Sequence, residues 1–376
     1  MDSDADLGTM AVPSAAIASP NRYSQELGEG RFTGDVLAVG DLPQKDQEIW
    51  RRFLAHQPAA FLSFPYVCAF ASHYPLVRIT RISAPDGRTV AFFPFQYRSR
   101  AFAMAGIGER LGGGLSDYFG IIAEQEFRIE PRALLQLSGL NSLFYSQLDE
   151  RQEGKGLVGE KPLKGFRINF PNGGDVYWEE KRRSDKKFVS DTERRERNLV
   201  RECGPLQFAF SDVDFVASLE KVMSEKRSQY RRTRVGDVLG SERTRSVLHT
   251  LCQTRDVYCS GVVSTLYAGN TWVASHFGLR CKSTLHYWFP VYNPLLKVFA
   301  PGRILLKQII LCAQANGLEC IDRGGGDSIA KRDFATSHHL FYSGLWQRPG
   351  PAALAHHIGL AIDWRMARLF GRTIFE

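Results

Sequence analysis

Several side chains in the C-terminal half of this 376-residue chain are of the types that perform acid–base chemistry. His276 lies in the run ASHFGL, a predicted strand, and its imidazole could act as a general base near neutral pH. Asp322 ends a short apolar run before the glycines 324–326 and could orient a second reactant. Lys331 follows in a predicted short helix and could contact a phosphate or neutralise Asp322. These are the candidate catalytic residues, and each has a structural alternative: a core histidine, a capping or ion-paired aspartate, and a solvated lysine.

A second pattern is typical of a phosphate-binding helix start. Pro301, Gly302 and Arg303 follow Ala300 and open a helix predicted over 301–316. The first turn of a helix presents unpaired N–H groups and the positive end of the helix dipole, which suit a pyrophosphate. Proline fits the first turn, glycine permits close approach and arginine adds a fixed positive charge. A Pro-Gly start is also a common structural cap, so the pattern alone does not identify a ligand.

A basic helical end could bind the other substrate. Lys226, Tyr230 and Arg231 lie near the end of a helix predicted over 214–231. We predict that residues 227, 230 and 231 share one face and meet an anionic acceptor, such as a sugar attached to a lipid diphosphate. The alternative is a solvated charged face.

The N-terminal half contributes one more pair of candidates. Asp117 and Tyr118 follow three glycines, 112–114, inside a strand predicted over 116–123. We predict that they line a cleft between two domains and hydrogen-bond a sugar. A turn aspartate beside a packed tyrosine explains the same pattern.

The overall composition restricts the class of protein. The net charge of +8 and the pI of about 9.1 favour an anionic partner, but no nucleic-acid module accompanies them, so nucleic acid is not the expected partner. Seven cysteines without a CxxC pair argue against a disulfide framework or a metal site and favour a reducing compartment. The sequence shows no signal peptide and no run of about 18 apolar residues. We therefore expect a cytoplasmic protein whose basic surface could contact a membrane peripherally.

The order of predicted elements indicates an α/β (α+β) fold with mixed, mostly antiparallel sheets flanked by helices. The C-terminal half reads as helices, three antiparallel strands, and then alternating strands and helices, and the N-terminal half reads as a weaker version of that plan. The pattern fades between about 150 and 180. The predicted parts are a disordered tail (1–30), an N-terminal domain (31–170), a C-terminal domain (180–348) and a C-terminal helix (349–376).

Longer stretches resemble a known family. They are KRSQYRRTRVGDVL (226–239), ASHFGLRCKSTLHYWFPVYNP (274–294), APGRILLKQII (300–310), IDRGGGDSIAKRDF (321–334), FLSFPYVCAF (61–70) and GGGLSDYFG (112–120). These runs resemble the cellulose-biosynthesis acetyltransferases of the CelD/BcsL type, which belong to the GNAT superfamily. The resemblance covers roughly residues 35–345 and is more specific in the C-terminal half.

The resemblance implies tandem GNAT-like domains with acetyl-CoA or another acyl-CoA as co-substrate. The cofactor would lie in a V-shaped opening between the strands around 285–291 and 318–322. Phe289 and Val291 would belong to the strand whose backbone pairs with the pantetheine arm, and 300–303 would take the pyrophosphate. Tyr292 would lie near the acceptor.

The resemblance also implies the reaction and its partners. A hydroxyl or amine of a polysaccharide or cell-envelope glycan precursor would attack the thioester directly, beside possible polysaccharide synthase machinery. The chain departs from the family at Arg323, usually apolar, at Ala330, usually aromatic, and at Asn293, usually aspartate. Two rivals stay open: an aminoacyl-tRNA-dependent transferase resembling the FemAB-like group, and a non-catalytic partner of a polysaccharide synthase.

Overall fold

The computed structural model describes residues 21–28, 30–351, 354 and 356–360. The helix predicted over 352–369 therefore lies largely outside the described residues, as do residues 1–20 of the predicted tail. The prediction of disorder is wrong for the end of that tail, because β1 (Asn21–Leu27) pairs along its length with β2 (Gly30–Leu37).

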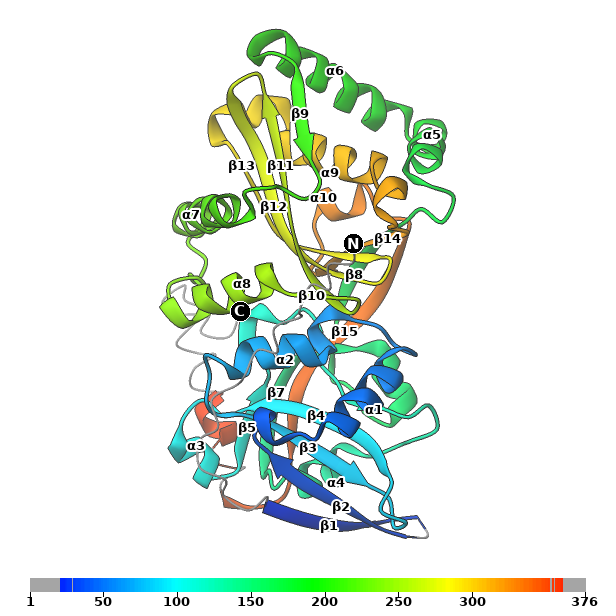
Figure 1. The fold of residues 1–376 in the computed structure, drawn as a ribbon, viewed down its shortest axis with the longest axis vertical. Helices are drawn as coiled ribbons and strands as arrows, with labels where there is room; N and C mark the ends of the chain where they lie inside the picture. Colours follow the sequence, from blue (N-terminus) through cyan, green and yellow to red (C-terminus); the bar gives the residue numbers. More distant parts are fainter. Residues whose placement is uncertain (1–20, 29, 352–353, 355, 361–376) are drawn as a thin grey trace, which may run out of the picture.

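The C-terminal half follows the predicted order (Figure 1). Two helices precede three antiparallel strands, and a further helix leads to a strand that runs parallel to the third of them. The elements are β9 (Leu206–Ala209), α7 (Phe215–Thr233), α8 (Glu242–Gln253), β10 (Arg255–Asp256), β11 (Cys259–Ala268), β12 (Thr271–Cys281), β13 (Thr284–Tyr292), α9 (Pro301–Leu311), β14 (Cys320–Gly325), α10 (Ile329–Arg332) and β15 (Ser337–Gln347).

The N-terminal half repeats this arrangement. Its strand β2 pairs antiparallel with β3, which follows two helices, as β9 does with β11, and β5 runs parallel to β7 as β13 does to β14. The elements are α1 (Gln44–Leu54), α2 (Phe64–Ala71), β3 (Val77–Ser83), β4 (Thr89–Gln96), α3 (Arg100–Met104), β5 (Ile107–Arg110), β6 (Ile122–Ala123), α4 (Pro131–Leu137) and β7 (Ser142–Asp149). The tandem plan expected from element order is confirmed by the strand pairing.

The region predicted as a break between domains is instead regular structure. It contains β8 (Lys161–Asn169) and α5 (Gly174–Ser184), followed by the predicted charged helix, α6 (Lys186–Cys203). The strand β8 escaped prediction because its first four residues are exposed, so it lacks the alternation of a half-buried strand. The division at 170 and 180 stays a prediction.

The two halves exchange their last strands. The strand order runs β7-β15-β8-β14 across the middle of one continuous sheet. Strand β8 follows the N-terminal half in sequence but pairs with β14, and β15 follows the C-terminal half but pairs with β7. In Figure 1, β15 runs from the upper half of the molecule into the lower half. The fold class is as predicted, with one shared sheet in place of separate sheets.

The strand predicted over 116–123 is wrong for most of its length. Within it only β6 is a strand, beside a single bridge from Phe119 to Leu148, and both β5 and β6 pair with β4. The chain between them leaves the sheet where Gly112 and Gly113 adopt φ angles of +76° and +50°, which suit glycine. The resulting loop, residues 111–121, carries Asp117 and Tyr118 out of the N-terminal half.

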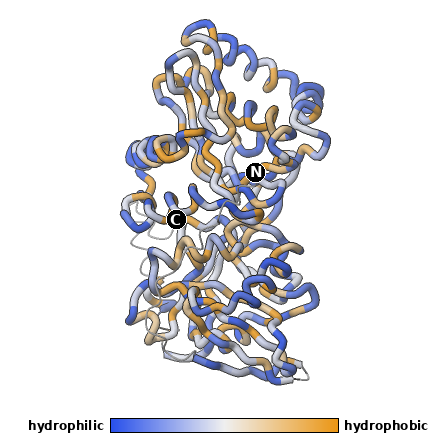
Figure 2. The backbone as a smooth tube through the Cα atoms, viewed as in Figure 1, coloured by the Kyte–Doolittle hydropathy of each residue, from blue (hydrophilic) through white to orange (hydrophobic). Residues whose placement is uncertain are grey.

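The hydrophobic core also joins the halves. Figure 2 shows apolar residues along the strands and on α9, whereas α6 is mainly hydrophilic. One cluster of buried side chains contains Trp50 and Phe61 from the N-terminal half together with Phe277 and Phe289 from β12 and β13. The halves therefore share this cluster, and each also has a cluster mostly of its own that includes residues of the strand exchanged from the other half, or next to it.

We expect that neither half folds alone. A fragment of residues 172–360 lacks β7 and β8, so it exposes the edge of β14 and leaves β15 without either of its partner strands. Circular dichroism during heating should show no cooperative transition for this fragment, and co-expression with residues 21–171 should restore the single transition of the intact chain. A cooperative transition of the isolated fragment would contradict the exchanged topology.

Candidate functional site

The strands β13 and β14 separate after a short stretch of pairing. They pair in parallel from Thr284 and Cys320 to His286 and Asp322, and β13 then continues alone on that side to Tyr292. Two cavities lie along this free part of β13. The V-shaped opening expected from the resemblance is therefore present.

The first cavity, here called the α9 cavity, has a volume of about 350 Å³. Ala300, Pro301, Gly302, Arg303 and Tyr292 line it, as the sequence predicted for a cofactor site next to an acceptor. Helix α9 has no side-chain cap at its N-terminus, so no side chain occupies its first N–H groups. A Cβ on Gly302 would have only Tyr292 near it, at 3.9 Å, so the helix start is open toward the cavity.

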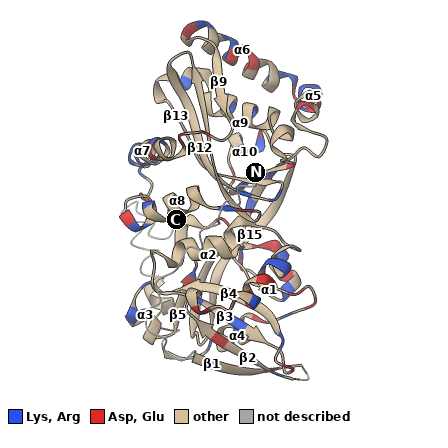
Figure 3. Ribbon diagram, viewed as in Figure 1, with Lys and Arg blue, Asp and Glu red and all other residues tan. Residues whose placement is uncertain are grey.

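Arg303 is less available than the sequence suggested. Its guanidinium lies 3.1 Å from a carboxylate oxygen of Asp191 and 4.0 Å from Asp333, over the ring of Phe188. Asp191 belongs to α6, whose surface mixes acidic and basic side chains (Figure 3). The positive end of α9, together with Lys297 in the lining, is therefore the main attraction for a phosphate.

The second cavity, here called the Asp117 cavity, has a volume of about 330 Å³. Asp117 and Gly114 reach it from the loop of the N-terminal half, Tyr230 reaches it from α7, and Lys331 from α10. It shares with the α9 cavity four lining residues, which are Lys226, Tyr287, Pro290 and Arg323. The two cavities thus adjoin along β13.

The carboxyl group of Asp117, which lines this cavity, has a raised pKa. Burial raises its pKa, and the nearby charge of Asp322 raises it further, while Lys331 and Arg110 lower it, which leaves a pKa of about 6. A Cβ on Gly324 would lie 2.9 Å from its Oδ2, so the carboxyl lies against the glycine turn after β14. A carboxylate with this pKa can accept a proton near neutral pH.

Lys226 lies where the cavities meet. Its Nζ is 3.4 Å from the Pro290 carbonyl oxygen and 5.5 Å from the centre of the Tyr230 ring. Burial, aided by repulsion from Lys331, lowers its pKa to about 8. Lys226 and Tyr230 share a face by their i, i+4 spacing.

The other basic residues of α7 face elsewhere. Arg227 pairs with Asp237 at 2.8 Å, and Arg231 bonds to Ser228. Both line a separate surface hollow together with Arg245. The prediction that residues 227, 230 and 231 present one common face to the acceptor is therefore wrong. Tyr230 lines the Asp117 cavity, whereas Arg227 and Arg231 line the separate hollow.

Asp322 is buried outside both cavities and holds the two halves together. Its Oδ2 accepts hydrogen bonds from the Tyr118 hydroxyl at 2.5 Å and from Arg167 Nε at 3.1 Å, and its Oδ1 accepts the Gly324 N–H at 2.8 Å. Burial opposes its ionisation, but His286, Arg167, His339 and the Tyr118 hydrogen bond outweigh burial and hold its pKa at about 2. This carboxylate stays ionised, so it positions its neighbours and is a poor proton acceptor at neutral pH.

Most of the residues that surround Asp322 were not identified from the sequence. Arg167 comes from β8, His286 from β13 and His339 from β15, and no local pattern marks them. Tyr118, predicted to bind a sugar, is buried in this group, where its hydroxyl also accepts a bond from Arg167 at 2.8 Å and lies 3.3 Å from His339.

His276 and two residues of β13 lie in the core. The His276 ring is fully buried, has no hydrogen-bond partner among the described residues and stacks on Tyr287 with ring centres 4.3 Å apart. Burial lowers its pKa to about 3, so it is neutral in the physiological range. Val291 is buried and lines neither cavity, whereas Phe289 is buried but lines the Asp117 cavity.

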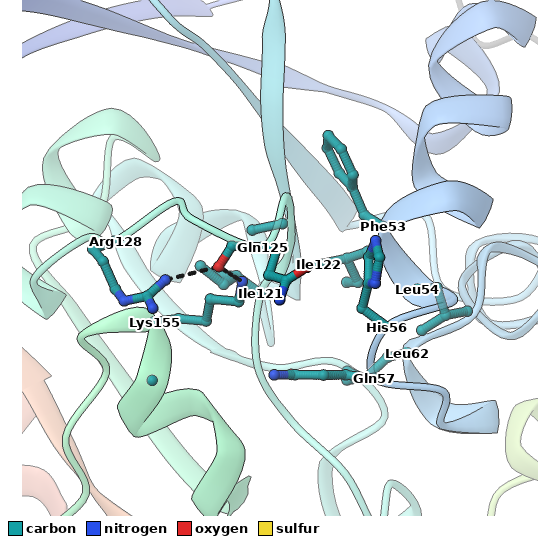
Figure 4. Close-up of a pocket in the computed structure, with 12 residues that line it drawn as sticks. Phe53, Leu54, His56, Gln57, Leu62, Ile121, Ile122, Gln125, Arg128 and Lys155 are labelled. Carbon is teal, nitrogen blue, oxygen red and sulfur yellow. Dashed lines mark hydrogen bonds between the residues drawn. The ribbon is translucent and has the colours of Figure 1, made fainter.

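The N-terminal half has its own cavity at the position equivalent to the α9 cavity. It has a volume of about 280 Å³ and lies between the end of α1, strand β6, the loop before α4 and the turn after β7 (Figure 4). Here Lys155 is buried and donates to the carbonyls of Glu124 and Gln125 at 2.6 and 2.8 Å, and Arg128 also donates to Gln125. These bonds close the loop that corresponds to the open start of α9.

Residues 186–332 match the family model described as Acetyltransferase (GNAT) domain. The C-terminal half carries a GNAT acetyltransferase domain. This match spans α6 to α10, includes the lining of the α9 cavity except Asp333 and Phe334, and supports an enzyme of the acyltransferase class. The narrower resemblance to the cellulose-biosynthesis acetyltransferases stays a prediction.

Solved structures of similar fold cover both halves of the chain. The structure titled "Crystal structure of FemX" aligns with a TM-score of 0.52 and 8% identity, over 82% of this chain and 97% of that chain. A conserved protein of unknown function from Bacteroides thetaiotaomicron VPI-5482 aligns with a TM-score of 0.50 and 10% identity, over 81% of this chain and 98% of that chain. At such identities the likeness shows the fold alone. No curated protein sequence matches the chain.

The described residues show neither a metal-binding cluster nor a membrane-spanning helix. They contain no cluster of three or more His, Cys, Asp or Glu side chains arranged to hold a metal ion. Within the same residues, every helix is too short or too polar to cross a bilayer.

The buried charge of Asp322 gives a test of how the GNAT domain is joined to the other half. Arg167→Met leaves that charge without its guanidinium, and we expect the free energy of unfolding to fall by about 3 kcal/mol in urea denaturation at pH 7. The double variant Arg167→Met/Asp322→Leu should recover much of the loss, because it removes both charges. Equal stability of Arg167→Met and the wild type would rule out this role.

Proposed function

We propose that the protein transfers an acyl group, most simply acetyl, from acyl-CoA to a hydroxyl or amine of a polysaccharide or cell-envelope glycan precursor. The observation that carries the proposal is the pair of adjoining cavities along β13, one open to an uncapped helix start and the other containing a carboxyl with a pKa of about 6.

The residues of the α9 cavity fit acyl-CoA. The Gly302 N–H and the positive end of the α9 dipole suit the pyrophosphate, the absence of a Cβ at Gly302 leaves it room, and Lys297 adds positive charge. The free edge of β13 beyond His286 supplies backbone groups for the amide-bearing arm. When bound there, acyl-CoA supplies the activated acyl group.

The chain's own residues supply the acid–base chemistry. Asp117 accepts the proton of the attacking hydroxyl or amine, because its pKa is close to neutrality and it lines the cavity on the acceptor side. Lys226 lies at the boundary of the cavities and donates hydrogen bonds to negative charge that develops on the acyl oxygen or on the departing sulfur. This assignment replaces His276 and Asp322 in the catalytic roles proposed from the sequence.

The lining of the Asp117 cavity supports a glycan acceptor. The rings of Tyr230, Tyr287 and Trp288 offer flat apolar surface beside charged groups, a combination that suits the faces and hydroxyls of a sugar. Cytoplasmic location, peripheral membrane contact and association with synthase machinery remain parts of the proposal that follow from the sequence.

We expect one acyl-CoA per chain, bound in the α9 cavity. Calorimetry with acetyl-CoA should give a stoichiometry near one, since Lys155 closes the equivalent loop of the N-terminal half. Gly302→Trp should abolish binding by filling the helix start, whereas Gly350→Trp, at a position where a Cβ meets nothing within 4 Å, should bind normally.

Absence of acetyl-CoA binding by folded wild-type protein would sink the CoA-dependent reaction. In that case the rival, an aminoacyl-tRNA-dependent transferase, predicts transfer from charged tRNA by the same preparation. Binding of acetyl-CoA without turnover on any glycan would favour the non-catalytic partner.

The role of Asp117 predicts the pH dependence of transfer. Because its ionised form is the base, kcat/KM should rise with pH through an apparent pKa of about 6. Lys331→Met removes a cation that lowers this pKa, so the rise should move to higher pH. Asp117→Asn should lower kcat by roughly 100-fold or more. The matched control Asp327→Asn removes a carboxylate outside both cavities and should keep the wild-type profile; an unshifted profile in Lys331→Met would count against Asp117.

A further inference from the structure

The Asp117 cavity contains more positive than negative charge. Lys226, Arg323 and Lys331 line it, and Asp117 is the only acidic residue in its lining, all of which lies in the described part of the chain. The imbalance is local, because neighbouring cations in the C-terminal half are neutralised: Arg303 pairs with Asp191 and Arg167 with Asp322.

The three cations bond to backbone carbonyls instead of carboxylates. Lys226 Nζ lies 3.4 Å from the Pro290 oxygen, and Lys331 Nζ lies 2.5 Å from that of Gly325. Among the described residues, no carboxylate lies within 4.0 Å of the charged nitrogens of Lys226, Arg323 or Lys331. Carbonyl groups orient these cations but leave their net charge in place.

Arg323 is held ready for another partner. One terminal nitrogen donates to the Ala330 carbonyl at 2.7 Å, and the guanidinium lies over the Tyr287 ring, 5.6 Å from its centre. Its Nε is buried and has no hydrogen-bond partner among the described residues. A buried donor without a partner costs free energy that a bound acceptor atom would recover.

The position of the three cations assigns their ligand to the acceptor side. Lys331 lines the Asp117 cavity but not the α9 cavity, whereas Gly302 and Lys297 line the α9 cavity but not the Asp117 cavity. The phosphates of a bound acyl-CoA are thus accounted for at the start of α9. The set of Lys226, Arg323 and Lys331 converges only where the acceptor would lie.

We propose that the acceptor is an anionic sugar, whose carboxylate or phosphate is bound by Lys226, Arg323 and Lys331 in the Asp117 cavity. This inference rests on the proposed function, and it narrows the acceptor from glycan precursors in general to those that carry a negative charge near the acylated group. A guanidinium and two ammonium groups supply the charge-assisted hydrogen bonds that such a group accepts. The ring of Trp288 in the same lining gives the sugar a packing surface.

The experiment compares the binding of three sugars to the full chain by calorimetry at pH 7 and low salt. The probes are glucuronate, glucose 1-phosphate and glucose, which share a ring and differ in charge. We expect at least one anionic sugar to bind about tenfold more tightly than glucose. Whichever anionic sugar shows the larger gain distinguishes carboxylate from phosphate.

Single substitutions test which residues bind the anionic group of the sugar. Arg323→Met and, separately, Lys331→Met should remove most of the preference for the anionic sugar, and the urea midpoint of each shows whether it folds. Arg232→Met removes an exposed charge from α7, the helix that carries Lys226, at a position outside both cavities, and should leave the preference unchanged. Gly302→Trp should also leave it unchanged.

The results that would contradict the anionic acceptor differ from those that would contradict the transfer reaction. Equal binding of all three sugars, no binding of either anionic sugar, or an equal loss in Arg323→Met and Arg232→Met would overturn the inference. Absence of an anion preference in the wild-type protein, with acetyl-CoA binding intact, refutes this inference alone. Absence of acetyl-CoA binding with an intact anion preference refutes the transfer reaction alone.

Discussion

Asp322 keeps a negative charge in a place closed to water, and the arrangement of the molecule depends on how that charge is neutralised. Arg167 of β8 supplies the opposite charge, and Tyr118 of the loop donates a hydrogen bond. His286 of β13 and His339 of β15, whose pKa values burial lowers, pack on the Tyr118 ring and complete the group from two further segments. An isolated buried carboxylate is costly, so the packing of these segments around Asp322 is stable only while its charge is compensated. The exchanged strands and the excursion of the loop between β5 and β6 both serve to bring these groups to one point.

The same arrangement makes the candidate site a joint product of both halves. The start of α9 belongs to the C-terminal half, whereas Asp117 arrives from the N-terminal half beside Tyr118. Because Tyr118 is fixed by Asp322 and the Gly324 turn is fixed by the other oxygen of that carboxylate, Asp117 is confined on two sides. A residue without direct access to the cavity thus determines where its neighbour's carboxyl lies.

Local signals predicted local structure, and the contacts between distant segments had no such signal. The Pro-Gly start of α9 and the antiparallel strands of the C-terminal half were predictable because turn residues and alternation mark them in sequence. His276 was assigned to the correct strand, but both faces of β12 are buried, so alternation could not tell a core position from a cavity. Arg167 meets Asp322 across 155 residues of sequence and His339 meets Tyr118 across 221, and no local pattern encodes contacts of that separation.

The strand exchange also bears on the origin of the chain. The order β7-β15-β8-β14 is symmetric about its centre, since each half gives its last strand to the other. Two separate copies of a single half could satisfy the same pairings as a two-fold symmetric dimer, each completing the sheet of its partner. Covalent joining of such copies frees the two halves to diverge. One could keep an open helix start while the other closed the equivalent loop with a lysine and lengthened a different loop to reach across the former subunit boundary.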